Sequence, residues 1–240
     1  MAVPLELTLQ EVRNESLYAK TFKFSLNNQD FTHQAGQYLT IDLPIDDPRG
    51  KRRPFTISSS PTEKEFVTIT TRPGPSPFKQ ALNSLDLGSR IVSKAPFGNF
   101  VLPSDTSKLV VMLAGGIGIT PFRSMIKFAC DTQLPLAITL LYSNRTPGDI
   151  PFKTEFDNLR HLNHHFKFIY TVTEPKTLAA KWNGLTGFID EKMIRENVPD
   201  LENSIFYVCG PPGMVEAMLE HLKQMDMPDD RIRFEKFSGY

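Results

Sequence analysis

Along the first hundred residues, apolar and polar side chains alternate over short runs that Gly and Pro interrupt. The alternation is clearest in residues 21–26 and 39–43, and residues 66–72 and 90–95 have strand-like compositions. Period two is typical of half-buried strands, and closely spaced turn residues favour an antiparallel sandwich or barrel. We therefore expect an all-β N-terminal half.

The pattern changes near residue 108. Residues 109–114 are continuously apolar, as expected for a strand covered on both faces. Phe122, Met125, Ile126 and Ala129 then recur at helical spacing, after a Thr120 suited to an N-cap. Further strands are expected at 136–142, 166–172, 205–209 and 231–237, with helical stripes around Phe156, Ile194 and Met218 between them. Alternating strands and helices predict a parallel sheet.

Together these patterns predict a two-domain fold. The N-terminal domain, residues 1–104, is expected to be an antiparallel Greek-key β-barrel, and the C-terminal domain, residues 105–240, a doubly wound α/β parallel sheet. The boundary falls in a polar connector at Pro103, Ser104 and Asp105.

Composition narrows the possible functions. The 27 acidic and 27 basic residues give no net charge, which disfavours nucleic-acid binding through a basic field. Two cysteines, Cys130 and Cys209, are too few for a four-thiolate iron–sulfur cluster, and no metal site is expected. The longest apolar run, 109–119, is too short to span a membrane, and no signal peptide is visible. We expect a cytoplasmic protein; its oligomeric state is left open.

A glycine-rich turn joins the first apolar strand of the second half to its helix. Gly116, Gly118, Thr120 and Pro121 fall in this turn, where backbone N–H groups and the helix dipole favour phosphate. The spacing differs from the usual dinucleotide fingerprint, and a simple tight turn is the alternative.

The end of the next strand bears on the choice of coenzyme. Ser143 and Arg145 stand where many dinucleotide folds place an acid for the ribose. They favour a 2′-phosphate, and so NADPH over NADH; an ordinary solvated arginine is the alternative.

Two further clusters carry candidate chemistry. Cys209 ends a strand, and Gly210 and Pro211 follow it, so this corner should face the same crevice as the glycine turn; inert packing is the alternative for Cys209. In the first half, Arg53 and Phe55 would share one face of a strand, so that phosphate and ring contacts serve one ligand.

These motifs, in this order, resemble the ferredoxin–NAD(P)H reductase family over nearly the whole chain. Residues 53–56, Arg-Pro-Phe-Thr, are similar to its R-x-Y-S flavin motif, with Phe for Tyr and Thr for Ser. Residues 115–121 resemble its G-G-x-G-x-T-P nucleotide loop, and residues 209–212 its C-G-P-P corner.

The resemblance implies a role for each residue. Arg53 would bind the flavin phosphate, Phe55 would pack on the flavin ring, and Thr56 would contact its N5 atom. The implied cofactor-binding set is Arg53, Pro54, Phe55, Thr56, Thr70, Thr71, Arg72, Phe78, Lys79, Gln80, Gly116, Gly118, Thr120, Pro121, Ser143, Arg145, Cys209, Gly210, Pro211, Phe237 and Tyr240. The implied catalytic set is Thr56, Cys209, Glu235 and Tyr240. The family often has Ser where this chain has Lys79.

The C-terminal aromatics have a separate implied role. In family members a C-terminal aromatic covers the second face of the flavin. Tyr240 is the first candidate for that cover and Phe237 the second; a frayed tail is the alternative.

The resemblance also implies the reaction. FAD rather than FMN would take electrons from NADPH or NADH and pass them to a one-electron acceptor, such as ferredoxin, flavodoxin or a small oxidant. Lys51, Arg52 and Lys79 are candidates for a basic docking face or a solvated rim. The alternatives are a free-flavin or ferric-chelate reductase and, from another class, a non-catalytic regulatory subunit that keeps the fold.

Overall fold

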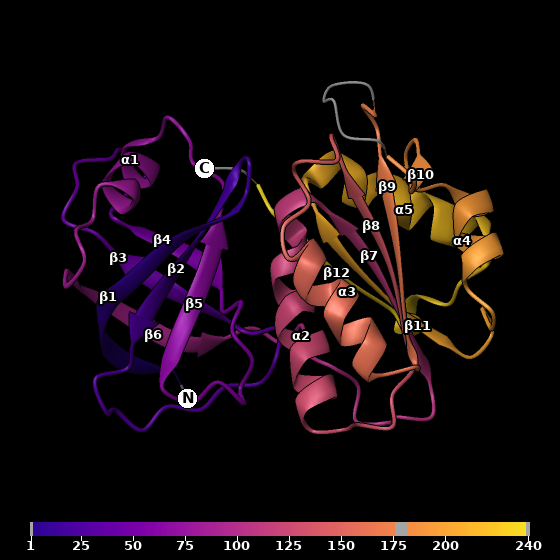
Figure 1. The fold of residues 1–240 in the computed structure, drawn as a ribbon, viewed down its shortest axis with the longest axis horizontal. Coiled ribbons are helices and arrows are strands. Elements are labelled where there is room, and N and C mark those ends of the chain that lie inside the picture. Colours follow the sequence, from indigo (N-terminus) through magenta and orange to yellow (C-terminus); the bar gives the residue numbers. More distant parts are fainter. Residues whose placement is uncertain (1, 176–181, 239–240) are drawn as a thin grey trace.

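The computed structural model describes residues 2–175 and 182–238, and it has two sheets in two adjacent domains (Figure 1). The N-terminal sheet has the order β4-β3-β6-β1-β2-β5, with every neighbouring pair antiparallel. Its strands are β1 (Val3–Ser16), β2 (Ala19–Ser25), β3 (Tyr38–Asp42), β4 (Arg52–Thr56), β5 (Phe66–Thr71) and β6 (Arg90–Phe97), with α1 (Pro77–Asn83) after β5. β6 lies between β3 and β1, which is a Greek-key order.

The apolar residues that alternate with polar ones in the sequence form the core of the barrel. Leu7, Phe22, Phe24, Leu39 and Ile41 are all fully buried in one apolar cluster, whereas the alternating Lys23, Thr40 and Asp42 are more exposed. β1, at 14 residues, is long enough to pair twice: its first half pairs with β6 and its second half with β2. The two pairings overlap at Thr8, and a register shift between Leu9 and Glu11 interrupts the pairing with β2, as a bulge would.

The C-terminal sheet is parallel throughout, in the order β10-β9-β8-β7-β11-β12. Its strands are β7 (Leu109–Gly115), β8 (Ile138–Asn144), β9 (Phe166–Val172), β10 (Leu185–Thr186), β11 (Ser204–Gly210) and β12 (Ile232–Lys236). The helices are the 3-10 turns η1 (Gly116–Ile119) and η2 (Asp229–Arg231), and α2 (Thr120–Asp131), α3 (Lys153–Leu162), α4 (Glu191–Asn197) and α5 (Pro212–Gln224).

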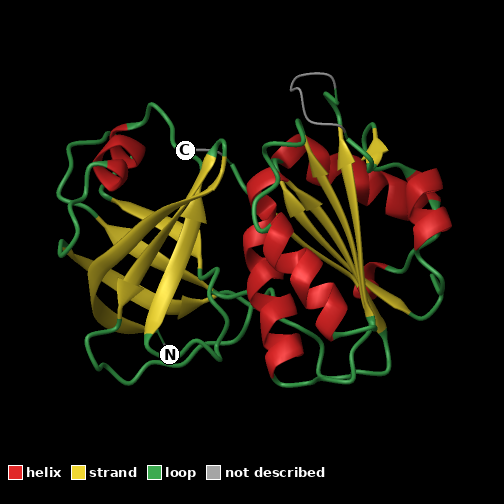
Figure 2. Ribbon diagram, in the orientation of Figure 1, coloured by secondary structure: helices red, strands yellow, loops and turns green. Residues whose placement is uncertain are grey.

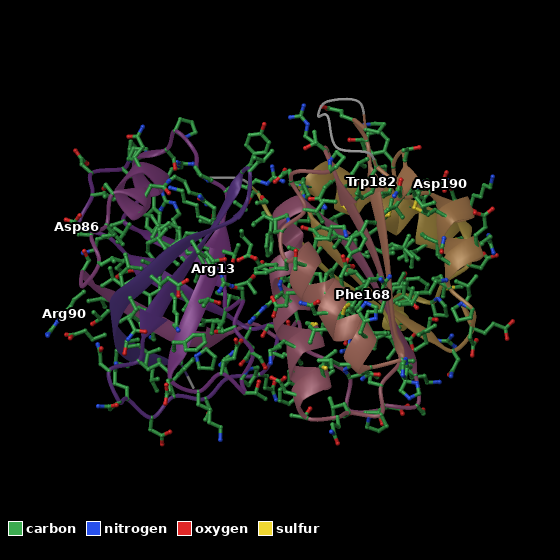
Figure 3. All side chains as sticks on the ribbon, in the orientation of Figure 1. Arg13, Asp86, Arg90, Phe168, Trp182 and Asp190 are labelled. Atoms are coloured by element: carbon green, nitrogen blue, oxygen red, sulfur yellow. The ribbon has the colours of Figure 1, made fainter. Side chains whose placement is uncertain are left out.

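Helices cover both faces of this sheet (Figure 2). Along β7, Val110 and Met112 belong to one apolar cluster, with α2 and α3, while Val111 and Leu113 belong to a second, with α4 and α5. This two-sided burial explains why the strand is apolar at every position. Phe168 of β9 packs in the first cluster, whereas Asp86 and Arg90 project from the barrel surface (Figure 3).

The two-domain fold class expected from the sequence is confirmed. The predicted bounds agree fully for β9, and Asp190 caps α4 by accepting a hydrogen bond from the Met193 N–H at 2.8 Å. Thr120 is not the N-cap of α2. The 3-10 turn η1 runs directly into the helix, so Thr120 is its first residue and its hydroxyl donates to the Ile117 carbonyl at 3.1 Å.

Polar side chains join the two domains. Arg123 of α2 is buried and donates to the Ser58 carbonyl in the barrel at 3.0 Å. The same guanidinium pairs with Glu63 on the barrel side and with Glu155 of α3, at 3.2 and 2.7 Å. The neighbouring Ser124 hydroxyl donates to the Ser59 carbonyl at 2.7 Å. α2 is therefore the element that holds the barrel against the parallel sheet.

Candidate functional site

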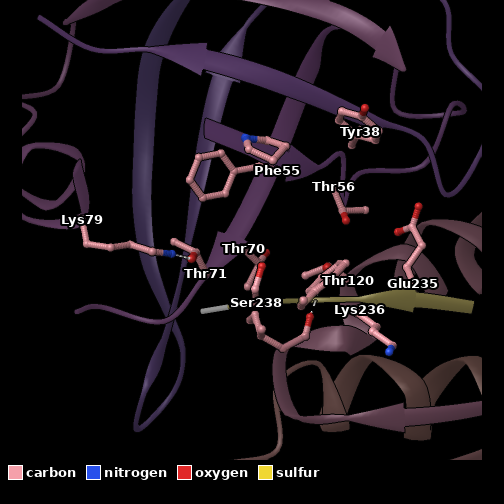
Figure 4. Close-up of a pocket in the computed structure, with 13 residues that line it drawn as sticks. Tyr38, Phe55, Thr56, Thr70, Thr71, Lys79, Thr120, Glu235, Lys236 and Ser238 are labelled. Carbon is pink, nitrogen blue, oxygen red and sulfur yellow. Dashed lines mark hydrogen bonds between the residues drawn. The ribbon is translucent and has the colours of Figure 1, made fainter. Parts of the chain in front are cut away.

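A cavity of about 330 Å³ lies where the two domains meet (Figure 4). Its wall is drawn from both sides: the barrel strands β3, β4 and β5 with α1, and the turn η1, helix α2 and strand β12 of the second domain. The described wall residues are Tyr38, Pro54, Phe55, Thr56, Thr70, Thr71, Lys79, Ile117, Thr120, Glu235, Lys236, Phe237 and Ser238.

On the barrel side, the wall is formed by paired strands. Tyr38 of β3 lies opposite Thr56 of β4 in the antiparallel register, and both side chains reach the cavity. Phe55 lies one residue before Thr56, with its ring 5.8 Å from that of the fully buried Phe78. Phe55 thus presents one flat surface to the cavity while Phe78 supports it from behind.

The far end of the barrel wall carries a buried amine. Lys79 of α1 is 8% exposed, and its ammonium donates to the hydroxyl of Thr71 and lies 5.2 Å from the centre of the Phe55 ring. Burial lowers the pKa of Lys79 from 10.5 to about 8. Ser76 caps the helix by accepting a hydrogen bond from the Lys79 backbone N–H at 3.3 Å.

Arg53 takes a different position from the one its motif suggests. It shares the inward face of β4 with Phe55 but does not contribute to the described cavity wall. Its guanidinium pairs with the buried Asp47 at 2.8 Å and donates to the Arg49, Gly50 and Arg52 carbonyls. These bonds fix the loop that precedes β4, and a flavin phosphate role for Arg53 stays a prediction.

The glycine turn is shaped by close backbone packing. Gly116 has φ +52°, a left-handed conformation that glycine adopts without strain, and its carbonyl accepts a hydrogen bond from the Tyr142 hydroxyl at 2.9 Å. Gly118 packs directly against the backbone of Cys209 and Gly210, with no room for a β-carbon. Ile117 and Thr120 contribute to the cavity wall, whereas the buried Gly118 and Pro121 do not.

Strands β11 and β12 bring the sequence-predicted cysteine and glutamate together. Cys209 pairs with Glu235 in the parallel register; Cys209 is fully buried, and Glu235 reaches the cavity. Burial, reinforced by Glu235, raises the pKa of the Cys209 thiol well above its usual range. Burial also raises the pKa of Glu235 to about 7.

After β12 the chain turns back toward the barrel. The Phe237 N–H donates to the Gly210 carbonyl at 2.8 Å, which brings Phe237 into the cavity wall. Tyr240, the first candidate for a ring-covering aromatic, lies outside the described residues.

The predicted coenzyme residues lie at the carboxyl ends of the strands. Ser143 is in β8 opposite Gly115, and Arg145 forms an exposed pair with Glu174 at 2.8 Å. Arg72, expected along the flavin arm, pairs with Asp149 of the second domain at 2.6 Å and lies beside Gly116.

Several sequence-predicted residues lie outside the cavity wall. Gln80 and Pro211 are exposed, Phe78 is covered by Phe55, and their binding roles stay predictions. Lys79 is buried, so it does not belong to an exposed docking face. Sequence reasoning did not assign Tyr38, Ile117, Lys236 or Ser238 to the site, although the last three adjoin residues that it did assign.

The wall suits a ligand that is part flat ring and part phosphate. Tyr38, Phe55 and Phe237 offer aromatic surface, and Thr56, Thr70 and Thr71 offer hydroxyls beside the Lys79 cation. Within the described residues, no cluster of His, Cys, Asp and Glu is arranged to hold a metal, and no helix has the length and apolarity needed to cross a membrane.

Two family models match the chain, one in each sheet. A family model described as an oxidoreductase FAD-binding domain matches residues 6–102, and one described as an oxidoreductase NAD-binding domain matches residues 112–220. The first match begins within β1 and ends after β6, and the second begins within β7 and ends within α5.

Named relatives include reductases that serve different systems. A glycine betaine monooxygenase reductase subunit of Chromohalobacter salexigens is 31% identical over 233 residues, which are 95% of this chain and 63% of that protein. NADH-cytochrome b5 reductase 1 of Cryptococcus neoformans is 31% identical over 208 residues, covering 82% of this chain and 69% of that protein. The chain thus spans about two thirds of these relatives' length.

Solved structures share the fold over almost the whole chain. A cytochrome P450 reductase from Amycolatopsis superposes with a TM-score of 0.86 at 23% identity, covering 99% of this chain and 71% of that one. The cytochrome b5 reductase domain of Ulva prolifera nitrate reductase gives 0.84 at 23% identity and covers 97% of each chain. These structures show the shared fold, and the two domain matches and the relatives establish that the chain belongs to the ferredoxin–NAD(P)H reductase family of oxidoreductases, which bind FAD and NAD(P)H.

Proposed function

We propose that this chain transfers electrons from NAD(P)H through FAD to a separate one-electron acceptor, with ferredoxin or flavodoxin as the first candidates. The observation that carries the proposal is the shared cavity, whose wall combines barrel residues with the glycine turn and β12. Two flat ring systems, one bound by each domain, can meet only where both domains line the same space.

The barrel residues of the wall have the chemistry to hold FAD. Phe55 offers its ring for packing, Thr56 a hydroxyl for a ring nitrogen, and Thr70 and Thr71 hydroxyls for the ribityl and phosphate arm. When bound, FAD supplies a ring that accepts two electrons together from NAD(P)H and releases them one at a time.

The second domain positions the coenzyme and provides a carboxyl group that can exchange a proton. The turn at Gly116 and Gly118 leaves backbone close to the ligand at the start of α2, where phosphate is favoured. Glu235, with its pKa raised to about 7, carries a proton in about half of the molecules near pH 7 and can exchange it with a ligand in the cavity. Buried Cys209 stays a neutral thiol that packs beneath this site.

A protein acceptor is supported by the relatives. One is named as the reductase subunit of a monooxygenase, and others as cytochrome b5 reductases. We expect the acceptor to dock at the barrel edge near exposed Lys51 and Arg52; Arg52 is already engaged with Asp42 at 2.6 Å. The free thiols of Cys130 and Cys209 suit a reducing compartment, and we place the reaction in the cytoplasm.

The central prediction is that the purified protein carries FAD and that NADH or NADPH bleaches its colour without oxygen. Adding ferredoxin or flavodoxin should then restore the oxidised spectrum in rapid-mixing experiments. The flavin released on denaturation should have the mass of FAD. A colourless protein that takes up no flavin would reject the proposal, and FAD lost on gel filtration with activity toward added free flavin would favour a free-flavin reductase instead.

The exposed Arg145–Glu174 pair, just after the ends of β8 and β9, should affect the preference between NADPH and NADH. Arg145→Ala is expected to weaken NADPH use more than NADH use, because only NADPH carries a 2′-phosphate for the guanidinium. Glu174 competes for the same guanidinium, so Glu174→Gln should shift the kcat/KM ratio toward NADPH, by roughly ten-fold for one charge-assisted hydrogen bond. Equal effects on the two coenzymes in both variants would remove Arg145 from the site.

A further inference from the structure

The tip of the β1–β2 hairpin lies on the side of the barrel that faces the second domain (Figure 1). Leu17 and Tyr18 form the two-residue turn between the strands. The Ser16 hydroxyl donates to the carboxylate of Asp149 at 2.9 Å, and the Leu17 N–H donates to the Gly148 carbonyl at 3.2 Å. Both acceptors belong to the loop that joins β8 to α3, so the turn is bound to the second domain through a side chain and through the backbone.

A second barrel residue contacts the same carboxylate. Arg72, directly after β5, donates to Asp149 at 2.6 Å, and the Asp149 side chain is 1% exposed. A buried charge is costly to leave without its partners. The hairpin tip and the end of β5 therefore keep a defined position against the loop after β8.

Although the turn is fixed, its two side chains are exposed. Leu17 is 59% exposed and Tyr18 57% exposed. Arg145 and Glu174 form their ion pair just after the ends of β8 and β9. This pairing is the main reason why the pKa of Arg145 is raised, and Tyr18 is close enough to add to the effect. A half-exposed aromatic ring of the barrel thus lies near the carboxyl ends of two strands of the parallel sheet.

The strand order tells which part of a dinucleotide reaches this place. In the sheet, β7 is followed by β8 and then by β9, and the glycine turn follows β7. Ligands of open parallel sheets lie across the carboxyl ends of the strands. A coenzyme with its nicotinamide in the shared cavity and its phosphates at the glycine turn extends its adenosine toward β8 and β9, where Tyr18 lies. An aromatic side chain there can stack on a purine base.

We propose that Tyr18 of the barrel packs on the adenine base of bound NAD(P)H, so that both domains bind the adenosine half of the coenzyme. The inference rests on the proposed function and deepens it by naming a barrel residue for the part of the coenzyme that does not react. NADH and NADPH carry the same base. Tyr18 therefore strengthens the binding of both coenzymes, whereas Arg145 is expected to distinguish them.

The test is the steady-state kinetics of the Tyr18→Ala holoenzyme with ferricyanide as the one-electron acceptor. The KM for NADH and the KM for NADPH should each rise roughly five- to ten-fold, the lower part of the range for base–aromatic stacking because the ring is half exposed. The kcat at saturating coenzyme should not change, since the contact is the same before and during hydride transfer.

Two fragments of the coenzyme locate the effect. Reduced nicotinamide mononucleotide lacks the adenosine, so Tyr18→Ala should leave its kcat/KM unchanged. ADP-ribose lacks the nicotinamide and should inhibit competitively, and Tyr18→Ala should raise its inhibition constant by the same factor as the KM.

Two further variants separate the ring from the fold. Tyr18→Phe keeps the ring, so its KM values should stay within about two-fold of those of the unmodified protein. Leu87→Ala is the matched control, because Leu87 is also a large apolar side chain in a barrel turn, between α1 and β6, and is 68% exposed. It should behave as the unmodified protein.

The outcomes distinguish the two proposals. Equal losses with the mononucleotide and the dinucleotides, or an inhibition constant of ADP-ribose that Tyr18→Ala does not change, overturn the assignment of Tyr18 and leave the proposed function intact. If neither NADH nor NADPH reduces the unmodified protein, the proposed function itself fails.

Discussion

Gly118→Ala should cost the second domain about 3 kcal/mol or more in stability and weaken NAD(P)H binding by at least a hundred-fold. The conformation of Gly118 is not the cause, since its φ is not among the positive values. A β-carbon there would overlap the carbonyl of Cys209 and the nitrogen of Gly210, and backbone atoms in the sheet interior cannot rotate away. The turn must separate from β11, and the nucleotide-binding N–H groups move with it.

The matched control is Gly213→Ala. Gly213 lies in α5, directly after the corner at residues 209–212. A β-carbon on Gly213 meets nothing within 4 Å. Alanine at an exposed helical position should stabilise the protein by about 0.5–1 kcal/mol. Chemical denaturation and titration with NADH and NADPH measure both variants. A Gly118→Ala protein as stable as the control would show that the turn is not packed as described.

Arg123→Met should lower stability by about 3–5 kcal/mol, the cost of removing one partner from a buried ion pair. The Arg123 side chain is 8% exposed, and it links Glu63, Glu155 and the Ser58 carbonyl. Its loss leaves two carboxylates near each other with no cation between them. For a chain of this size, the melting temperature should fall by about 10 °C or more.

The control for that variant is Lys192→Met. Lys192 forms an i,i+4 pair with Glu196 on α4, but both side chains are strongly exposed, at 80% and 61%. Such a pair is worth about 0.3–0.5 kcal/mol, so its removal should hardly change the melting temperature. The melting temperature of Arg123→Lys should lie between those of Arg123→Met and Lys192→Met, because an ammonium cannot reproduce the bidentate geometry of the guanidinium. An Arg123→Met protein that melts within 2 °C, or roughly 1 kcal/mol, of the unmodified one contradicts the role of this network.

The same network gives the interface a pH dependence. Burial alone would raise the pKa of Glu63, but the hydrogen bond and charge of Arg123 outweigh it, and the net pKa is lowered. A carboxyl whose folded pKa is depressed contributes stability above its unfolded pKa, and that contribution is lost as pH falls through the folded value. Acid should therefore loosen the contact between the domains, and Arg123→Met should abolish this part of the acid sensitivity.

The parts of the fold that follow a simple periodicity were predictable from the sequence. Residues 109–114 are apolar throughout because helices cover both faces of β7. In residues 39–43 apolar and polar side chains alternate because only one face of β3 is buried. β1 was not predicted. Its outer half runs through Glu11, Arg13 and Asn14, whose side chains are exposed, so the strand is maintained by pairing with β2 and not by a buried face. Pairing partners distant in sequence leave no local pattern.

The sequence predicted several residues of the cavity wall, but it did not predict the partners of the charged side chains. The motifs located Phe55, Thr56, Thr120 and Glu235, and all four lie in the cavity wall. The partner of Arg53 was not foreseen, because Asp47 precedes the motif in a loop with no periodic signal. Likewise, no sequence rule shows that Lys79 points at Thr71 across two elements. Such pairings depend on tertiary contacts, which a linear pattern does not contain.

The double pairing of β1 has a consequence for synthesis on the ribosome. Its outer half can form a hairpin with β2 as soon as about thirty residues have emerged, since a short loop closes at low entropic cost. Its first half must wait for β6, whose Arg90 pairs with Thr8 more than eighty positions earlier in the chain. Until then residues 3–8 present unpaired backbone groups, a known route to intermolecular association. Nascent chains arrested before residue 97 should therefore be the stage most in need of a chaperone.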